Sequence, residues 1–225
     1  MTAESPTNAL DNEARRCFIE AFKKLYPANG MRGISGAALA KRAGYSRSTF
    51  YRDFESVYDV LRLVEIEATP YQRMKYLLDH ADSVGMREIT DGFLQSFQER
   101  EDLIRMLVQH EDDNRYRERL HDCFLPVFRA QAERVFIMEP GEYDVLAEYI
   151  THAKLGLLRI WALDLVPLGL GHMTQITDSV LESSMWTRVE AAARAKAEGR
   201  PFERTPLSFF QKRQPWIQNR PMLEP

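Results

Sequence analysis

Apolar residues recur every three or four positions along most of this chain, a spacing that indicates amphipathic helices. The first such helix is expected over residues 12–26, where the period is carried by Phe18, Phe22, Leu25 and Tyr26. Pro27 and Gly30 are expected to end it. A second helix follows Ser35, a third follows Ser46, and a fourth begins near Glu55 and ends at Pro70.

Beyond residue 70 the helical period continues with few interruptions. Helices are predicted over residues 71–82, 88–99, 101–110, 113–137, 142–165 and 173–197. The segment Val135–Met138 is β-branched and aromatic but too short to outweigh its helical surroundings. The pattern therefore predicts an all-α fold without strands.

Both ends of the chain break this pattern. Residues 1–10 are polar and contain Pro6, so they are expected to be disordered. Residues 199–225 hold five of the eleven prolines together with large apolar side chains such as Phe202 and Trp216. This Pro-rich end is either an arm packed on the body or a loose tail.

Residues 34–54 predict two short helices joined by a tight turn at Gly44. Ser35 and Ser46 are suitable N-caps for the two helices, and Gly44 suits the left-handed conformation of a turn. The second helix carries Arg47, Ser48, Thr49, Tyr51 and Arg52 within two turns. This pattern predicts a helix-turn-helix whose second helix can enter the major groove of DNA.

Composition fits an ordinary globular protein and gives no sign of a membrane or redox role. The chain has 225 residues, 44% of them hydrophobic, with no apolar stretch as long as a bilayer is thick. Its N-terminus does not look like a signal peptide. Two widely separated cysteines, Cys17 and Cys123, show no metal-like spacing, so we expect inert thiols, no metal, no cofactor and a cytoplasmic location.

Charge is unevenly distributed. Residues 13–52 contain nine Lys or Arg and two acids, a balance of +7, and the chain as a whole carries −3. The remainder therefore sums to −10. A basic module on an acidic body suits a protein that presents one end to a polyanion.

Residues 15–63 resemble the DNA-binding domain of TetR-like transcriptional regulators. The resemblance is carried by Phe18, Ala21, Phe22, Leu25, Tyr26, Gly30, Leu39, Ala40, Ala43–Ser46, Thr49–Arg52 and Phe54. Two positions depart from the family pattern: Val57 stands where a phosphate-binding Lys is common, and Gly36-Ala37-Ala38 replaces long polar residues. Both departures remove expected DNA contacts.

The resemblance implies domains at residues 11–68, for DNA binding, and 69–198, for dimerisation and an effector. Arg47 is placed to read base edges and Ser48 to lie near the groove floor, while Thr49 and Tyr51 are expected at phosphates. Arg52 and Lys41 either contact the backbone or are solvated. Ser35 and Ser46 offer helix N-termini to the duplex, and Phe50 and Phe54 are assigned to the core.

The last long helices would form the dimer interface, since residues 142–165 are apolar on more than one face. Interface candidates are Leu155, Leu158, Ala162, Ile176 and Val180. A small apolar effector could contact Phe93, Phe97, Met106, His110, Phe128, His152 and Arg159. A protein partner acting on this domain without a small molecule is the alternative.

The expected function is a homodimeric repressor that binds a near-palindromic site on double-stranded DNA and has no contact with membranes. No nucleophile, metal or phosphate-loop signature suggests an enzyme. A low-specificity architectural DNA-binding protein is the remaining alternative, although the acidic body argues against it.

Overall fold

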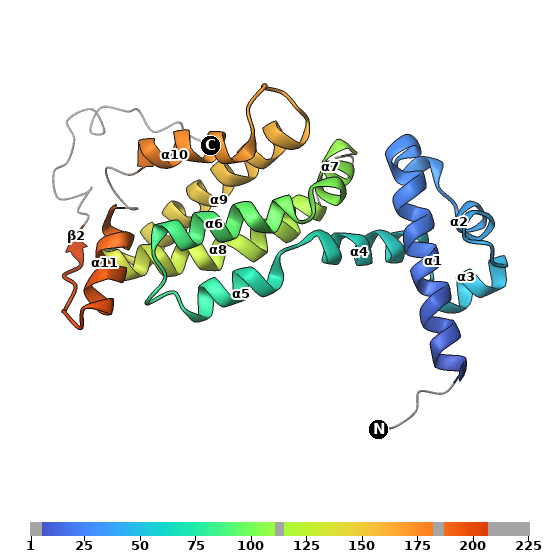
Figure 1. The fold of residues 1–225 in the computed structure, drawn as a ribbon, viewed down its shortest axis with the longest axis horizontal. Helices are drawn as coiled ribbons and strands as arrows, with labels where there is room; N and C mark the ends of the chain where they lie inside the picture. The colour runs from blue at the N-terminus through green and yellow to red at the C-terminus, as the bar shows by residue number, and fades with distance from the viewer. Residues whose placement is uncertain (1–5, 111–114, 182–186, 207–225) are drawn as a thin grey trace, which may run out of the picture.

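The computed structural model describes residues 6–110, 115–181 and 187–206, and this part of the chain is almost entirely helical. Figure 1 shows a small head formed by helices α1 to α3, a larger body formed by helices α5 to α11, and helix α4 running between them. The predicted all-α class is confirmed, apart from one pair of two-residue strands.

The head is held together by aromatic side chains. It contains α1 (Pro6–Asn29), a short 3-10 turn (Met31–Gly33), α2 (Gly36–Ala43) and α3 (Arg47–Asp53). Phe18 of α1 is fully buried and lies with its ring centroid 5.3 Å from that of Phe50 and 6.0 Å from that of Phe54. Large aromatic rings bury much area and prefer edge-to-face contacts. These contacts therefore fix the angle at which α3 packs against α1.

Helix α1 is longer than the sequence predicted at both ends. It begins at Pro6, inside the stretch expected to be disordered, and continues through Pro27 to Asn29. Proline costs most in a helix interior, but here only two further residues follow it. Gly30 then ends the helix with a φ of 56°, a left-handed conformation that suits glycine.

Helix α4 (Val57–Ala68) begins where Asp59 accepts a hydrogen bond from the Ser56 backbone N–H at 2.8 Å. Its inner face buries Val60, Leu61 and Val64 against neighbouring helices. The chain then turns at Thr69 and Pro70, as the sequence predicted.

The body surrounds two long helices, α8 and α9, which pack along each other (Figure 1). Its helices are α5 (Tyr71–Asp79), α6 (Met86–Gln98), α7 (Glu101–Gln109), α8 (Arg115–Val135), α9 (Pro140–Ala162), α10 (Leu170–Leu181) and α11 (Thr187–Ala197). The single helix predicted over 173–197 is wrong: α10 packs on α9 and α6, while α11 packs on α8 and α6.

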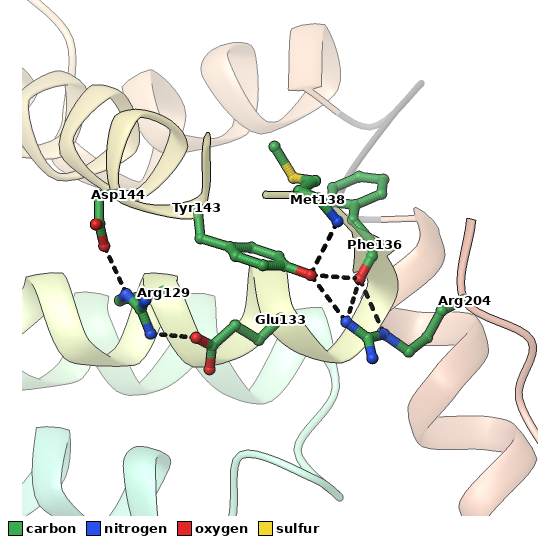
Figure 2. A network of polar contacts seen from close by, with 7 residues as sticks. All are labelled: Arg129, Glu133, Phe136, Met138, Tyr143, Asp144 and Arg204. Atoms are coloured by element: carbon green, nitrogen blue, oxygen red, sulfur yellow. Dashed lines mark hydrogen bonds and ion pairs between the residues drawn. The ribbon is translucent and has the colours of Figure 1, made fainter. Parts of the chain in front are cut away.

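The segment after α11 returns to the body as an arm. Phe136–Ile137 forms strand β1, which pairs in parallel with β2 (Thr205–Pro206), so the expectation of helix at these positions is also wrong. Arg204 donates to the Phe136 carbonyl oxygen at 2.9 and 2.6 Å and to the Tyr143 hydroxyl at 2.8 Å (Figure 2). These contacts favour the packed arm for residues 200–206, and residues 207–225 lie outside the described part of the chain.

No helix in the described ranges is both long and apolar enough to cross a bilayer. Burial raises the pKa of the Cys123 thiol to about 12, so the thiol stays protonated at neutral pH. This agrees with the expectation of an inert side chain, because the thiolate is the reactive form.

Candidate nucleic-acid interface

The turn between α2 and α3 has the geometry that its residues predicted. The Ser35 hydroxyl accepts a hydrogen bond from the Ala38 N–H at 3.2 Å and caps α2. Gly44 ends α2 with φ 79° and ψ 20°. The Ser46 hydroxyl accepts from the Thr49 N–H at 3.1 Å and caps α3. Both helix starts are therefore fixed by side chains rather than by packing alone.

Gly36 is closely packed at the start of α2. A Cβ atom at this position would lie 2.8 and 2.9 Å from two ring carbons of Phe50 and 3.0 Å from the Tyr51 hydroxyl. A side chain here would push α2 away from α3. The lack of a side chain at Gly36 therefore lets the two helices approach closely.

Helix α3 presents a polar outer face on an apolar base. Phe50 is fully buried and Phe54 nearly so, as predicted. Arg47 and Ser48 are exposed, Thr49 is half-buried, and Tyr51 is 51% exposed. Tyr51 is thus a surface residue, and its ring rests edge-on against that of Phe50 at 5.2 Å.

Hydroxyl groups link the first turn of this face. The Ser46 hydroxyl lies 2.8 Å from those of Ser48 and Thr49. Hydroxyls can either donate or accept, so this cluster can turn its donors outward to phosphate oxygens. Arg47 follows Ser46 directly and occupies the first position of the helix, where a side chain extends toward a groove.

Two cations of the head are neutralised within the protein. Arg52 forms two hydrogen bonds with Asp53, at 3.0 and 3.3 Å, and its side chain is 53% exposed. Lys23 bonds Glu67 at 2.9 Å and Glu20 at 3.0 Å. Partial burial opposes its charge, but these two carboxylates outweigh that effect and raise its pKa.

The other cations of the head remain exposed. They are Arg15, Arg16, Lys24, Arg32, Lys41, Arg42 and Arg47. Arg15 also lies over the Phe54 ring, with its guanidinium carbon 5.3 Å from the ring centre. The predicted basic character of this end is therefore carried on its surface, where a polyanion can reach it.

Head and body meet beside α4 through side-chain contacts that the sequence did not reveal. His110 at the end of α7 donates from Nε2 to the Pro27 carbonyl oxygen at 2.8 Å, and its ring lies 5.0 Å from that of Tyr26. The buried Glu65 of α4 pairs with Arg119 of α8 at 3.2 Å. His110, a predicted effector contact, thus connects two helices of the structure instead.

The predicted effector residues do not surround one pocket. Phe97 and Met106 are core residues, and Phe93 and Phe128 line an interior cavity of about 10 Å³. That volume is about one water molecule, whereas sites for small organic ligands span about 300–1,000 Å³. His152 and Arg159 instead line a surface hollow of about 310 Å³ between α8 and α9.

The predicted dimer residues need a correction. Leu155, Leu158 and Ala162 are buried inside the protomer itself, so they are not available to a partner. Ile176 is 48% exposed, and the side chain of Val180 lies outside what the structure describes. The outer face of α9 carries different residues, and Val145 and Tyr149 are 71% and 61% exposed there.

Comparisons with known proteins give similarity to solved structures only in fold. No family model matches the chain, and a search of curated proteins finds no match. Among solved structures, the chain is similar to a TetR-family transcriptional regulator from Marinobacter aquaeolei VT8. The two share 16% sequence identity and a TM-score of 0.45, over 83% of this chain and 98% of that one.

Proposed function

We propose that this protein is a dimeric, sequence-specific DNA-binding regulator of transcription with a TetR-like helix-turn-helix. The observation that carries the proposal is the two-sided construction of α3. Its inner side is anchored by the buried Phe50 and Phe54, while Arg47, Ser48 and Tyr51 face solvent. A short helix with a rigid base and a polar outer face is the part of a helix-turn-helix that enters the major groove.

Each outward residue of α3 has a distinct proposed role. Arg47 reads base edges, since a guanidinium can bond guanine O6 and N7 together and so discriminate by about 1–3 kcal/mol. Thr49 and Tyr51 bind phosphates and fix the register of the helix on the duplex. Ser48 is small enough to let α3 approach the groove floor, and Lys41 adds backbone attraction. Arg52 has a lesser role because Asp53 already holds its guanidinium.

Dimerisation is proposed through the outer face of α9. Val145, Tyr149 and Gly156 lie on one side of this helix at intervals of four and seven residues. Val145 and Tyr149 are exposed, and a Cβ atom at Gly156 would have no neighbour within 4 Å. A two-fold axis on this face would pair the helices and place two copies of α3 on successive major-groove faces, about 34 Å apart.

Control of DNA affinity is proposed to act through α4. This helix contacts α1 in the head, and its last turn is fixed to the body by Arg119 and by the Tyr116 hydroxyl, which donates to the Ala68 carbonyl at 3.2 Å. A signal that moves α8 would therefore tilt α4 and change the spacing of the two heads. Such coupling is typically worth about 1–3 kcal/mol, and release of the operator would make the protein a repressor.

The signal itself is either a small molecule or a protein partner. The interior cavity at Phe93 and Phe128 is too small for an organic effector in this conformation. Binding there would have to open the core. A contact on the body surface requires no such opening, and the hollow beside His152 and Arg159 provides one place for it.

The test is identification of the DNA sites bound across the genome, followed by binding assays on the best site. We expect a near-palindromic sequence that is bound about 10³-fold or more tightly than unrelated DNA. Arg47→Ala and Tyr51→Ala should each weaken binding by about tenfold or more. The matched controls are Arg194→Ala on α11 and Tyr76→Ala on α5, which lie in the body.

Two outcomes would overturn the proposal. One is DNA affinity that is unchanged in Arg47→Ala and Tyr51→Ala while both proteins stay folded. The other is strong salt dependence without preference among sequences, which is the behaviour of an architectural protein.

A further inference from the structure

We propose that His121, Glu148 and His152 form a binding site for a divalent transition-metal ion, of which Zn²⁺ is the best match. The three residues come from the two long helices of the body. His121 lies on α8, and Glu148 and His152 lie one turn apart on α9. One ligand atom from each, two imidazole nitrogens and a carboxylate oxygen, lies within 4.8 Å of the other two.

The three groups already converge on the Glu148 carboxylate. Its Oε2 atom is 2.7 Å from His121 Nε2 and 3.6 Å from His152 Nδ1. Neighbouring ligands of a tetrahedral zinc ion are roughly 3.3 Å apart, given metal–ligand bonds of about 2.0–2.1 Å. Small side-chain rotations would therefore bring the three atoms to bonding distance, because none of the three groups is deeply buried.

A second carboxylate orients one of the imidazoles. Asp122 lies 3.4 Å from Nδ1 of His121, the ring nitrogen that faces away from Glu148. Metal-bound histidines commonly donate their other N–H to a carboxylate, which fixes the tautomer and strengthens the ligand. With Nδ1 directed at Asp122, Nε2 is the nitrogen left to bind an ion beside Glu148.

The surroundings leave room for the remaining ligands. His121 and His152 open into the hollow of about 310 Å³ between α8 and α9, which Glu118 and Gly156 also line. Zn²⁺ is commonly bound by two histidines and one carboxylate, with its remaining coordination positions open. Imidazole also suits Ni²⁺ and Cu²⁺. Solvent would complete the coordination. The ion would cross-link α8 to α9 within a single chain, so its protein ligands need no residue of a partner, and Gly156 places the hollow beside the proposed dimer face.

The experiment is titration of the tag-free, metal-stripped full chain with Zn²⁺ in competition with a chelating indicator. Co²⁺ spectroscopy then reports the coordination geometry. We expect one ion per chain, histidine-ligated Co²⁺ bands and an unfolding midpoint that rises with Zn²⁺ concentration. His121→Ala, His152→Ala and Glu148→Gln should abolish this binding, and Asp122→Asn should weaken it by about 10- to 100-fold.

The matched control is His172→Ala, which removes an exposed histidine of α10 outside the cluster and should leave the affinity unchanged. The proposal is overturned if the wild-type chain binds no Zn²⁺ at micromolar concentration. It is equally overturned if the three ligand variants bind Zn²⁺ as tightly as the wild type, since the ion would then be held elsewhere. Circular dichroism of each variant checks that the helices are intact.

Discussion

Single residues set the distance between the two helices of the DNA-binding head. Gly36 is the clearest case, because the space that a Cβ atom would need is occupied by the Phe50 ring and the Tyr51 hydroxyl. Tyr51 depends on this arrangement for its outward direction, since its ring rests on that of Phe50. A change at Gly36 would therefore affect both stability and the DNA-facing surface.

Gly36→Ala is expected to lower the free energy of unfolding by about 1–3 kcal/mol, the usual cost of forcing an extra carbon into a packed core. Urea unfolding measures this directly. The control is Gly141→Ala at the start of α9, where an added Cβ atom has no neighbour within 4 Å. Equal stability of the two variants would show that α2 and α3 are not closely packed at this point.

Individual side chains were also where sequence reasoning was most successful. Ser35, Gly44 and Ser46 have the capping roles predicted for them, because caps depend on local chemistry. The aromatic core positions Phe50 and Phe54 were also predicted correctly. The pairing of Arg52 with its neighbour Asp53 was missed, although the two residues are adjacent in the sequence.

At the scale of elements, the sequence located most helices but not their partners. Helix α9 is apolar on several sides, so its spacing could not show which face points inward. Leu155 and Leu158 were assigned to the interface yet are buried in the protomer, while Val145 and Tyr149 were not chosen and are exposed. The positions of α7, α8 and α10, which pack on α9, decide which face is buried, and the sequence does not give these positions.

The same limit applies to the short parallel strands. Phe136 pairs with Thr205, which is far along the chain, and two-residue strands have no period to detect. Side chains also hold the arm. Arg204 satisfies the Phe136 carbonyl and shares the Tyr143 hydroxyl, while Tyr143 also accepts from the Met138 N–H at 3.0 Å (Figure 2). Arg188 donates to the Glu203 carbonyl at 3.0 Å.

Arg204→Ala is expected to destabilise the protein by about 1–2 kcal/mol, because it removes charge-assisted hydrogen bonds from the Phe136 carbonyl. Proteolytic cleavage near residues 200–206 should become faster, and thermal unfolding gives the loss of stability. Arg200→Ala is the comparison, since the guanidinium of Arg200 bonds Glu198, two residues away in the chain. If both variants were cleaved at the same rate, Arg204 would not be what holds the arm.

At the scale of the whole molecule, the exposed residues of α9 determine the proposed assembly. Val145→Glu would place a charge at the centre of the pairing face, where it would be desolvated without a partner. The dissociation constant of the dimer should rise by at least about tenfold, equivalent to about 1.4 kcal/mol. Size-exclusion chromatography with light scattering over a concentration series measures the change.

Leu78→Glu on α5 provides the comparison for this variant, since Leu78 is also an exposed apolar residue but lies on another helix. It should remain dimeric. A dimer that tolerates Val145→Glu as well as it tolerates Leu78→Glu would place the two-fold axis elsewhere.

The contact between His110 and Pro27 has a consequence for the autonomy of the head. The last carbonyls of a helix lack partners within it, and that of Pro27 accepts a hydrogen bond from His110, which follows α7 and lies 83 positions later in the chain. A fragment ending at residue 68 would keep every residue that faces DNA, yet its longest helix would fray at the C-terminal end. The DNA-binding head of this protein is therefore completed by the same body that is proposed to regulate it.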